Sequence, residues 1–147
     1  MSAVEILPNL WLGNIKASLN NDFLIKNNIK CIVNCTVNYQ FNEKLPANIK
    51  KIRLPVSDTG TQEANDTMLQ YIDKTVTFIY RSLLKGDCIL VHCYAGKQRS
   101  PTIIASFIIK YCECNYEQAL HALSVKWPFY PDHYIPALKT WSELQKN

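Results

Sequence analysis

No apolar run in the 147-residue sequence is long enough to cross a membrane, so we predict no membrane span. The sequence also lacks internal repeats, low-complexity stretches and linkers, which predicts a single domain over residues 1–147. Residues 1–5 have no basic start of the kind that opens a secretion signal. From these absences we expect a cytoplasmic, intracellular protein, and the sequence leaves a nuclear location open as well.

Cysteine is present, but not in the pattern of a disulfide framework or a zinc site. The chain has six cysteines in an apolar-rich sequence without a secretion signal, which favours free thiols. Cys112 and Cys114 form a C-x-C pair, yet no second pair follows at zinc-finger spacing. We therefore predict no metal and no cofactor, and we expect Cys31, Cys35 and Cys88 to be buried as small apolar residues.

The charge of the chain is modest and not concentrated in one place. The formal net charge is +4 and the basic residues are scattered along the sequence. An anionic ligand fits this balance, whereas a nucleic-acid surface is not expected, because such surfaces need clustered basic residues. The oligomeric state cannot be deduced from the sequence.

Hydrophobic periodicity predicts strands and helices that alternate along the chain. Short apolar runs predict strands at residues 4–7, 10–12, 31–35, 49–55 and 88–91. Helical spacing predicts helices at about residues 17–27, 65–84, 100–111, 115–126 and 131–145. This order predicts an α/β fold with a mostly parallel central sheet flanked by helices. In such sheets, ligands bind beyond the carboxyl ends of the strands.

One segment at such a position carries a specific pattern. Residues 92–100 read His-Cys-Tyr-Ala-Gly-Lys-Gln-Arg-Ser and lie between a predicted strand and a helix that Pro101 favours at its first turn. A Cys and an Arg six positions apart arise by composition in roughly one chain in eight. The full pattern, with His, Gly and Ser in place, has a chance on the order of a few in a million. The segment is therefore the strongest candidate site.

The residue types in this loop suit a phosphate group. A tight loop that enters a helix turns successive N–H groups inward, and Gly96 permits the backbone conformation that this requires. Arg99 offers a planar fork for two phosphate oxygens. The residues predicted to bind substrate are Tyr94, Ala95, Gly96, Lys97, Gln98 and Arg99.

The inward N–H groups of the loop and the charge of Arg99 also stabilise a thiolate, so Cys93 is the predicted nucleophile. Asp58, on a turn after a strand, is the predicted general acid, with an ordinary turn residue as the competing interpretation. Asp66 is the reserve acid, but it is expected near the start of a helix. Ser100 is predicted to form a hydrogen bond with the Cys93 sulfur and to help that sulfur leave phosphorus after a phosphocysteine has formed. His92 is expected to shape the loop without transferring protons.

Four segments resemble one enzyme family. The pattern His-Cys-x-x-Gly-x-x-Arg-Ser at residues 92–100 is the signature of the cysteine-based protein tyrosine phosphatases. Pro-Val-Ser-Asp at residues 55–58 resembles the general-acid loop of their dual-specificity branch. Residues 10–14 and 99–102 are also similar to that branch. The resemblance covers nearly the whole chain.

This resemblance implies a small catalytic domain that removes phosphate from tyrosine, serine and threonine side chains of proteins through a phosphocysteine. It implies Cys93 as nucleophile, Arg99 as phosphate ligand and Asp58 as acid. Two residues depart from the usual pattern. Gln98 replaces a serine that is frequent before the loop arginine, and Lys97 adds a second cation, as in phosphoinositide phosphatases.

Other functions remain open on the sequence. Lys97 is the one feature in favour of an inositol-lipid or RNA 5′-end phosphatase. A binding module that holds phosphorylated partners without turnover commonly lacks the cysteine, the arginine or the acid, all of which have candidates here. Sulfur transfer, as in rhodanese-like domains, fits the arginine–serine pair less well.

Several residues near these segments are expected to have ordinary structural roles. His121 and His133 are expected at the surface or in packing, and Trp11, Trp127 and Trp141 in the core.

A regulatory disulfide between Cys88 and Cys93 is not expected. The two residues flank one predicted strand and are about 16 Å apart, which is too far for a bond. Cys35 follows a different strand, so its distance from Cys93 depends on the fold.

Overall fold

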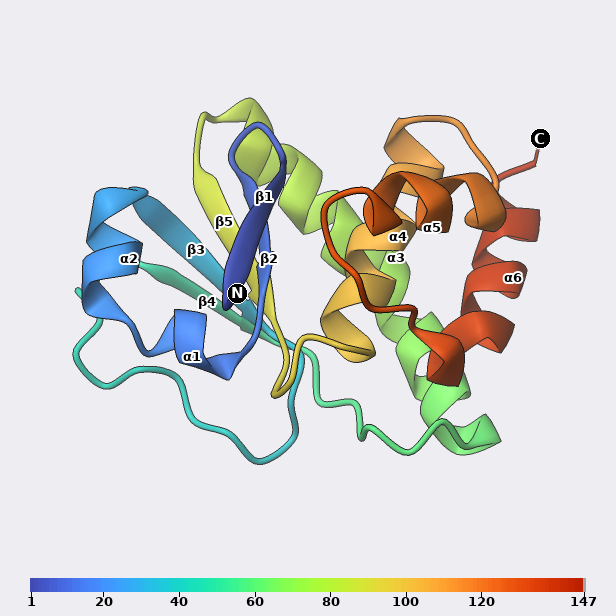
Figure 1. Ribbon diagram of the computed structural model, residues 1–147, viewed down its shortest axis with the longest axis horizontal. Coiled ribbons are helices and arrows are strands. Elements are labelled where there is room, and N and C mark those ends of the chain that lie inside the picture. Colours follow the sequence, from blue (N-terminus) through green and yellow to red (C-terminus); the bar gives the residue numbers. More distant parts are fainter. Residues whose placement is uncertain (147) are drawn as a thin grey trace.

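A five-stranded sheet lies at the centre of the structure, a computed structural model that describes residues 1–146 (Figure 1). The strand order is β1-β2-β5-β3-β4. The strands are β1 (Ala3–Leu7), β2 (Leu10–Gly13), β3 (Ile29–Asn34), β4 (Lys50–Arg53) and β5 (Cys88–His92). β1 is antiparallel to β2, and every other neighbouring pair is parallel. The predicted α/β fold with a mostly parallel sheet is confirmed.

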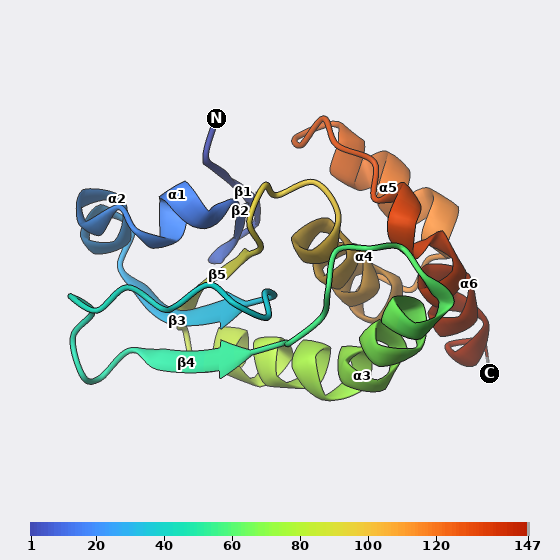
Figure 2. The ribbon, with the colours of Figure 1, turned by 90° about the horizontal axis from the view of Figure 1, so that it is seen from below.

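Helices cover both faces of this sheet (Figure 2). The short helices α1 (Ile15–Ser18) and α2 (Asn21–Lys26) pack on one face, and α3 (Gln62–Leu84) and α4 (Arg99–Tyr111) pack on the other. Helices α5 (Tyr116–Ser124) and α6 (Ile135–Leu144) pack against α4, and the 3-10 turn η1 (Asp132–Tyr134) precedes α6. No helix in residues 1–146 has the length and apolar character needed to cross a membrane.

The most buried elements are the two that flank the predicted phosphate loop. Strand β5 lies between β2 and β3, and Ile89, Leu90 and Val91 are fully buried because helices cover both faces of the sheet. Helix α4 is buried from Arg99 to Ile109. The loop between β5 and α4 is therefore fixed at both ends by the core.

The structure corrects one predicted helix near the start of the chain. The predicted helix at residues 17–27 is interrupted, and α1 and α2 are separate because Asn20 begins a new helix. The Asn20 side-chain oxygen accepts a hydrogen bond from the Phe23 N–H at 3.1 Å. Such a cap takes the place of the intrahelical partner that an uninterrupted helix supplies.

Helix α3 begins earlier than predicted, and this decides the role of the reserve acid. The Thr61 hydroxyl caps the helix by accepting from the Ala64 N–H at 3.1 Å. Asp66 is therefore inside the helix, where it is exposed and accepts a hydrogen bond from the Gln62 side chain at 2.8 Å. The predicted capping pair of α5 is confirmed, because Asn115 and Gln118 bond each other's backbone N–H groups.

Candidate active site

The loop between β5 and α4 lies at the carboxyl end of the central strand (Figure 1). Two outside donors hold its carbonyl groups. The Ile15 N–H donates to the Tyr94 carbonyl at 3.0 Å, and the Trp127 indole Nε1–H donates to the Gly96 carbonyl at 2.6 Å. Gly96 has a φ of +73°, and a Cβ added there would lie 2.9 Å from Trp127 Cζ2. Glycine is therefore required at this position.

The Tyr94 and Gly96 carbonyl groups bond donors outside the loop, and the backbone N–H groups of the loop are available to a ligand. Within residues 1–146, no backbone N–H from Tyr94 to Ser100 donates to a backbone carbonyl. Successive unpaired N–H groups at the start of a helix form a concave site for an anion. The predicted phosphate-binding role of the loop backbone fits this arrangement.

The sulfur of Cys93 lies at the base of this loop. Its residue is 1% exposed, and Sγ is 3.3 Å from the Ser100 hydroxyl oxygen. The same hydroxyl donates to the Gly13 carbonyl at 3.2 Å. A hydroxyl has a single proton, so Ser100 can donate to Gly13 or rotate and donate to the sulfur.

The guanidinium of Arg99 is buried, with 6% of the residue exposed. Its Nη1 donates to the Val56 carbonyl at 2.9 Å, while Nε has no hydrogen-bond partner. The ion pairs found among residues 1–146 do not include Arg99. A buried cation without a carboxylate partner is costly, and an anionic ligand would supply the missing charge.

His92 is fully buried beneath the loop, and its Nδ1 donates to the Cys93 carbonyl at 3.1 Å. Burial lowers the pKa of His92 to about 4, partly opposed by that hydrogen bond, and the nearby cations Arg53 and Arg99 lower it further. The imidazole is therefore neutral at neutral pH. This fits the predicted role of shaping the loop.

Asp58 lies in the loop that Arg99 contacts, two residues after Val56. The Tyr134 hydroxyl donates to the carbonyl of Ser57, beside Asp58. Burial, and next the negative charge of Asp58, raise the pKa of Tyr134 above its usual range, and Cys93 also contributes. The fold thus brings Asp58 to the side of the phosphate loop, whereas the reserve acid Asp66 stays bonded within α3.

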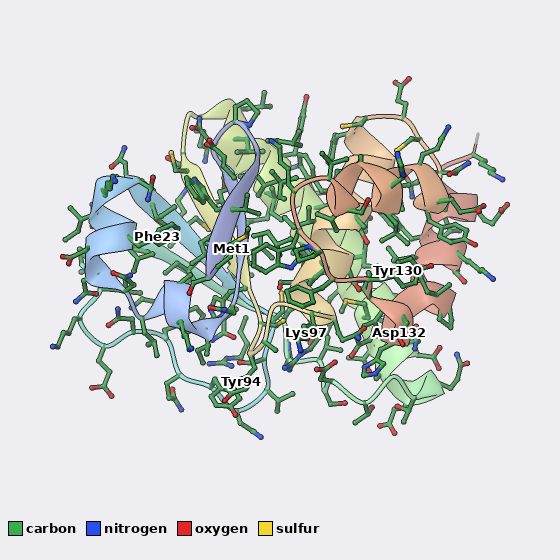
Figure 3. The ribbon with its side chains drawn as sticks, viewed as in Figure 1. Met1, Phe23, Tyr94, Lys97, Tyr130 and Asp132 are labelled. Carbon is green, nitrogen blue, oxygen red and sulfur yellow. The ribbon has the colours of Figure 1, made fainter. Side chains whose placement is uncertain are left out.

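Figure 3 labels two exposed side chains of the loop, Tyr94 and Lys97, and each contacts an aromatic ring from another segment. Tyr94 stacks on Tyr39, with ring centroids 4.7 Å apart. The Lys97 ammonium lies 5.3 Å from the centre of the Phe129 ring. Ala95 is exposed as well. These contacts form a rim around the loop, and nothing in the local sequence indicated Tyr39 or Phe129.

The Gln98 side chain bonds the turn before α6. Its Nε2 donates to an Asp132 carboxylate oxygen at 2.7 Å, and its Oε1 accepts from the His133 N–H at 3.0 Å. The predicted substrate contact of Gln98 therefore depends on its backbone N–H. Sequence reasoning missed this link because the turn is far away along the chain.

Cys35 lies next to the floor of the site. Its N–H donates to the His92 carbonyl at 2.8 Å. Burial raises the pKa of the Cys35 thiol well above its usual range, and the charge of Cys93 raises it further. Cys88 begins β5, at the end of the strand away from Cys93. All six cysteines are free thiols in this structure.

Comparisons with known proteins show the family of this chain. The family described as "Dual specificity phosphatase, catalytic domain" matches residues 10–143. Human dual specificity protein phosphatase 16 is 32% identical over 84% of this chain and 18% of its own length. Dual specificity protein phosphatase 22-B of Danio rerio is 29% identical over 84% of this chain and 64% of its own length.

Solved structures show the same fold. The crystal structure of human DUSP28 superposes with a TM-score of 0.89 at 17% identity, covering 100% of this chain and 97% of that one. The chain spans 18% to 64% of the length of the two relatives above. By the match over residues 10–143, this chain belongs to the dual-specificity phosphatase catalytic-domain family.

Proposed function

We propose that this chain hydrolyses phosphate monoesters on tyrosine, serine and threonine side chains of proteins through a phosphocysteine intermediate. One observation carries the proposal: the buried guanidinium of Arg99, which has no carboxylate partner in residues 1–146, adjoins an N–H-rich loop with the sulfur of Cys93 at its base. A phosphate dianion supplies the charge that this site lacks.

The first step transfers the phosphoryl group to sulfur. Loop N–H groups and Arg99 hold the non-bridging oxygens while the Cys93 thiolate attacks phosphorus. An S–P bond forms as the ester P–O bond breaks, and the Asp58 carboxyl gives its proton to the departing oxygen. The products of this step are the dephosphorylated side chain, a phosphocysteine and an Asp58 carboxylate.

The second step returns the enzyme to its starting state. The Asp58 carboxylate takes a proton from a water molecule whose oxygen attacks phosphorus. A P–O bond forms, the P–S bond breaks and inorganic phosphate leaves. The Cys93 sulfur departs as a thiolate, and the Ser100 hydroxyl, 3.3 Å from it, supports that charge by donating a hydrogen bond.

We favour proteins over inositol lipids and RNA 5′ ends as the substrates of this site. Lys97 was the one feature in favour of those alternatives. Its ammonium already has a partner, because it lies over the Phe129 ring. The stacked Tyr94 and Tyr39 rings, 50% and 43% exposed, give the rim an apolar surface suited to a peptide. The binding-module alternative is disfavoured because the chain has candidates for all three groups: Cys93 and Arg99 lie in one loop, and Asp58 lies in the loop that Arg99 contacts.

The test of the chemistry is hydrolysis of an aryl phosphate between about pH 5 and pH 8 under reducing conditions. We expect Cys93→Ser to abolish turnover, while the matched control Cys112→Ser, at an exposed thiol, keeps it. Asp58→Ala is expected to lose the basic limb of the pH profile. An inactive wild type, folded and reduced, would reject the enzymatic proposal in favour of a phospho-binding module.

The test of the substrate class compares four compounds under one condition. These are a phosphotyrosine peptide, its phosphothreonine counterpart, a soluble phosphoinositide and an RNA with a 5′ triphosphate. Comparable turnover of the two peptides, above that of the other compounds, is the expected result. Strict selectivity for one peptide, or preference for the lipid headgroup or the RNA, would contradict the proposed specificity.

A further inference from the structure

The side chain of His133 contacts the predicted general acid. Its Nδ1 lies 3.2 Å from the Asp58 carboxylate oxygen Oδ1, and the side chains are 39% and 37% exposed. The two residues are separated by 75 positions in the sequence. The expectation of a plain surface or packing role for His133 therefore omits its most specific contact.

His133 is itself held from three directions. Its N–H donates to the Gln98 side chain at 3.0 Å, and its carbonyl accepts from the Asn65 side chain at 2.9 Å. Its ring packs against Gly60, where an added Cβ would lie 3.0 Å from the imidazole Cγ. Fixed backbone and ring positions mean that the contact with Asp58 costs little further ordering of the histidine.

The turn that carries His133 also connects the two catalytic loops. Gln98 of the phosphate loop bonds Asp132, which Figure 3 labels in this turn, and Tyr134 bonds the Ser57 carbonyl next to the acid. The turn Asp132–Tyr134 is thus tied to the nucleophile loop on one side and to the acid loop on the other. A change in the turn would alter the position of the acid relative to the loop.

We infer that His133 is a positioning residue for the general acid Asp58, an inference that depends on the function proposed above. The Nδ1–H of His133 donates to Oδ1, which fixes the carboxyl rotamer. The other oxygen, Oδ2, is then free to carry the proton to the departing oxygen. A hydrogen bond to one carboxyl oxygen orients the second without consuming the transferable proton.

This role has a consequence that depends on the leaving group. A strongly acidic phenol departs from its ester without protonation, so the position of Asp58 has little effect on the rate of phosphoryl transfer to Cys93. An ester of a weakly acidic alcohol or phenol needs the proton, so a displaced acid slows it. Damage to the phosphate loop, by contrast, would slow all esters alike.

The experiment measures kcat/KM, which reports phosphoryl transfer to Cys93 and not the later hydrolysis of the phosphocysteine, for a series of aryl phosphates of graded leaving-group acidity. The variants are His133→Ala, His133→Asn and, as matched control, His121→Ala at an exposed histidine on α5. We expect His133→Ala to lose about 10- to 100-fold on the poorest leaving group and much less on the best. His133→Asn should recover most of this, because the asparagine Nδ2 occupies nearly the same place as the histidine Nδ1.

A second measurement separates this inference from the proposed function. Hydrogen exchange of residues 57–60 should accelerate in His133→Ala and not in His121→Ala, whatever the turnover. Equal losses of kcat/KM on all leaving groups, or no loss, would overturn the positioning role while leaving the phosphatase proposal in place. An inactive wild type would overturn both, and unchanged exchange would show that His133 does not fasten the acid loop at all.

Discussion

The guanidinium Nη1 of Arg99 lies 2.9 Å from the carbonyl oxygen of Val56, and this hydrogen bond joins the phosphate loop to the loop of the predicted acid. The contact uses one edge of the fork. Nε, which is buried without a partner, stays available for an anion. In the proposed mechanism, one side chain therefore orients the phosphate and also sets the distance between that phosphate and Asp58.

Replacement of Arg99 by lysine is expected to lower kcat/KM by about 100-fold or more, because an ammonium cannot grip two oxygens and bond Val56 together. Steady-state kinetics with an aryl phosphate measure this loss. Arg81→Lys, at an exposed position on α3, is the matched control and should behave as wild type. An Arg99→Lys variant with near-normal kcat/KM would contradict the bidentate role.

Ser100→Ala is expected to slow breakdown of the phosphocysteine more than its formation, because the leaving sulfur loses the hydroxyl that lies 3.3 Å away. Rapid mixing should then show a burst of phenol followed by a steady rate lowered about 10-fold or more. Ser106→Ala is the matched control, since that buried hydroxyl on the same helix bonds only the Thr102 carbonyl in this structure. A lowered rate without a burst would assign Ser100 to loop structure instead.

Trp127→Phe removes the donor to the Gly96 carbonyl and is expected to cost about 1–3 kcal/mol of unfolding free energy. Urea denaturation measures this cost. Trp141→Phe is the matched control, because the Trp141 indole donates to the buried Ser106 carbonyl at 3.0 Å, away from the loop. Both variants should lose stability, but only Trp127→Phe should weaken inhibition by inorganic phosphate. Equal inhibition by phosphate in the two variants would show that the hydrogen bond from Trp127 to Gly96 does not shape the loop.

His92 is expected to make the fold sensitive to acid. Its pKa is lowered to about 4 in the folded chain, so the unfolded chain binds a proton at higher pH than the native one does. Stability is therefore present above the ordinary histidine pKa and is lost as the pH falls toward 4, by about 3 kcal/mol in total. Denaturation curves for His92→Asn between pH 7 and pH 4 should show this loss reduced.

The control for that experiment is His121→Asn, at an exposed histidine, which should retain the acid sensitivity of the wild type. An unchanged pH dependence in His92→Asn would show that other groups cause the acid loss. The asparagine keeps a donor for the Cys93 carbonyl, so a general collapse of the loop is not the expected result.

The parts of the site that lie together in the sequence were predictable from it. Residues 92–100 hold the predicted nucleophile, the arginine, the glycine and the serine in one run, and a strand-loop-helix setting follows from the apolar pattern on each side. Local signals also predicted the sheet class and the strand at residues 88–91, which the structure extends to Cys88–His92, with Cys88 partly exposed instead of buried as expected. The break between α1 and α2 was missed because the capping signal of Asn20 competes with a continuous apolar spacing.

By itself, then, the sequence determined the chemistry proposed for the loop, because that chemistry depends on residue types at short, fixed spacing. Only the tertiary structure decided which distant residues serve it. Trp127 supports Gly96 and His133 meets Asp58, contacts that span 31 and 75 positions of the chain. Such contacts follow from how α4, α5 and the turn before α6 pack, and packing of that kind leaves no periodic or local mark in the sequence.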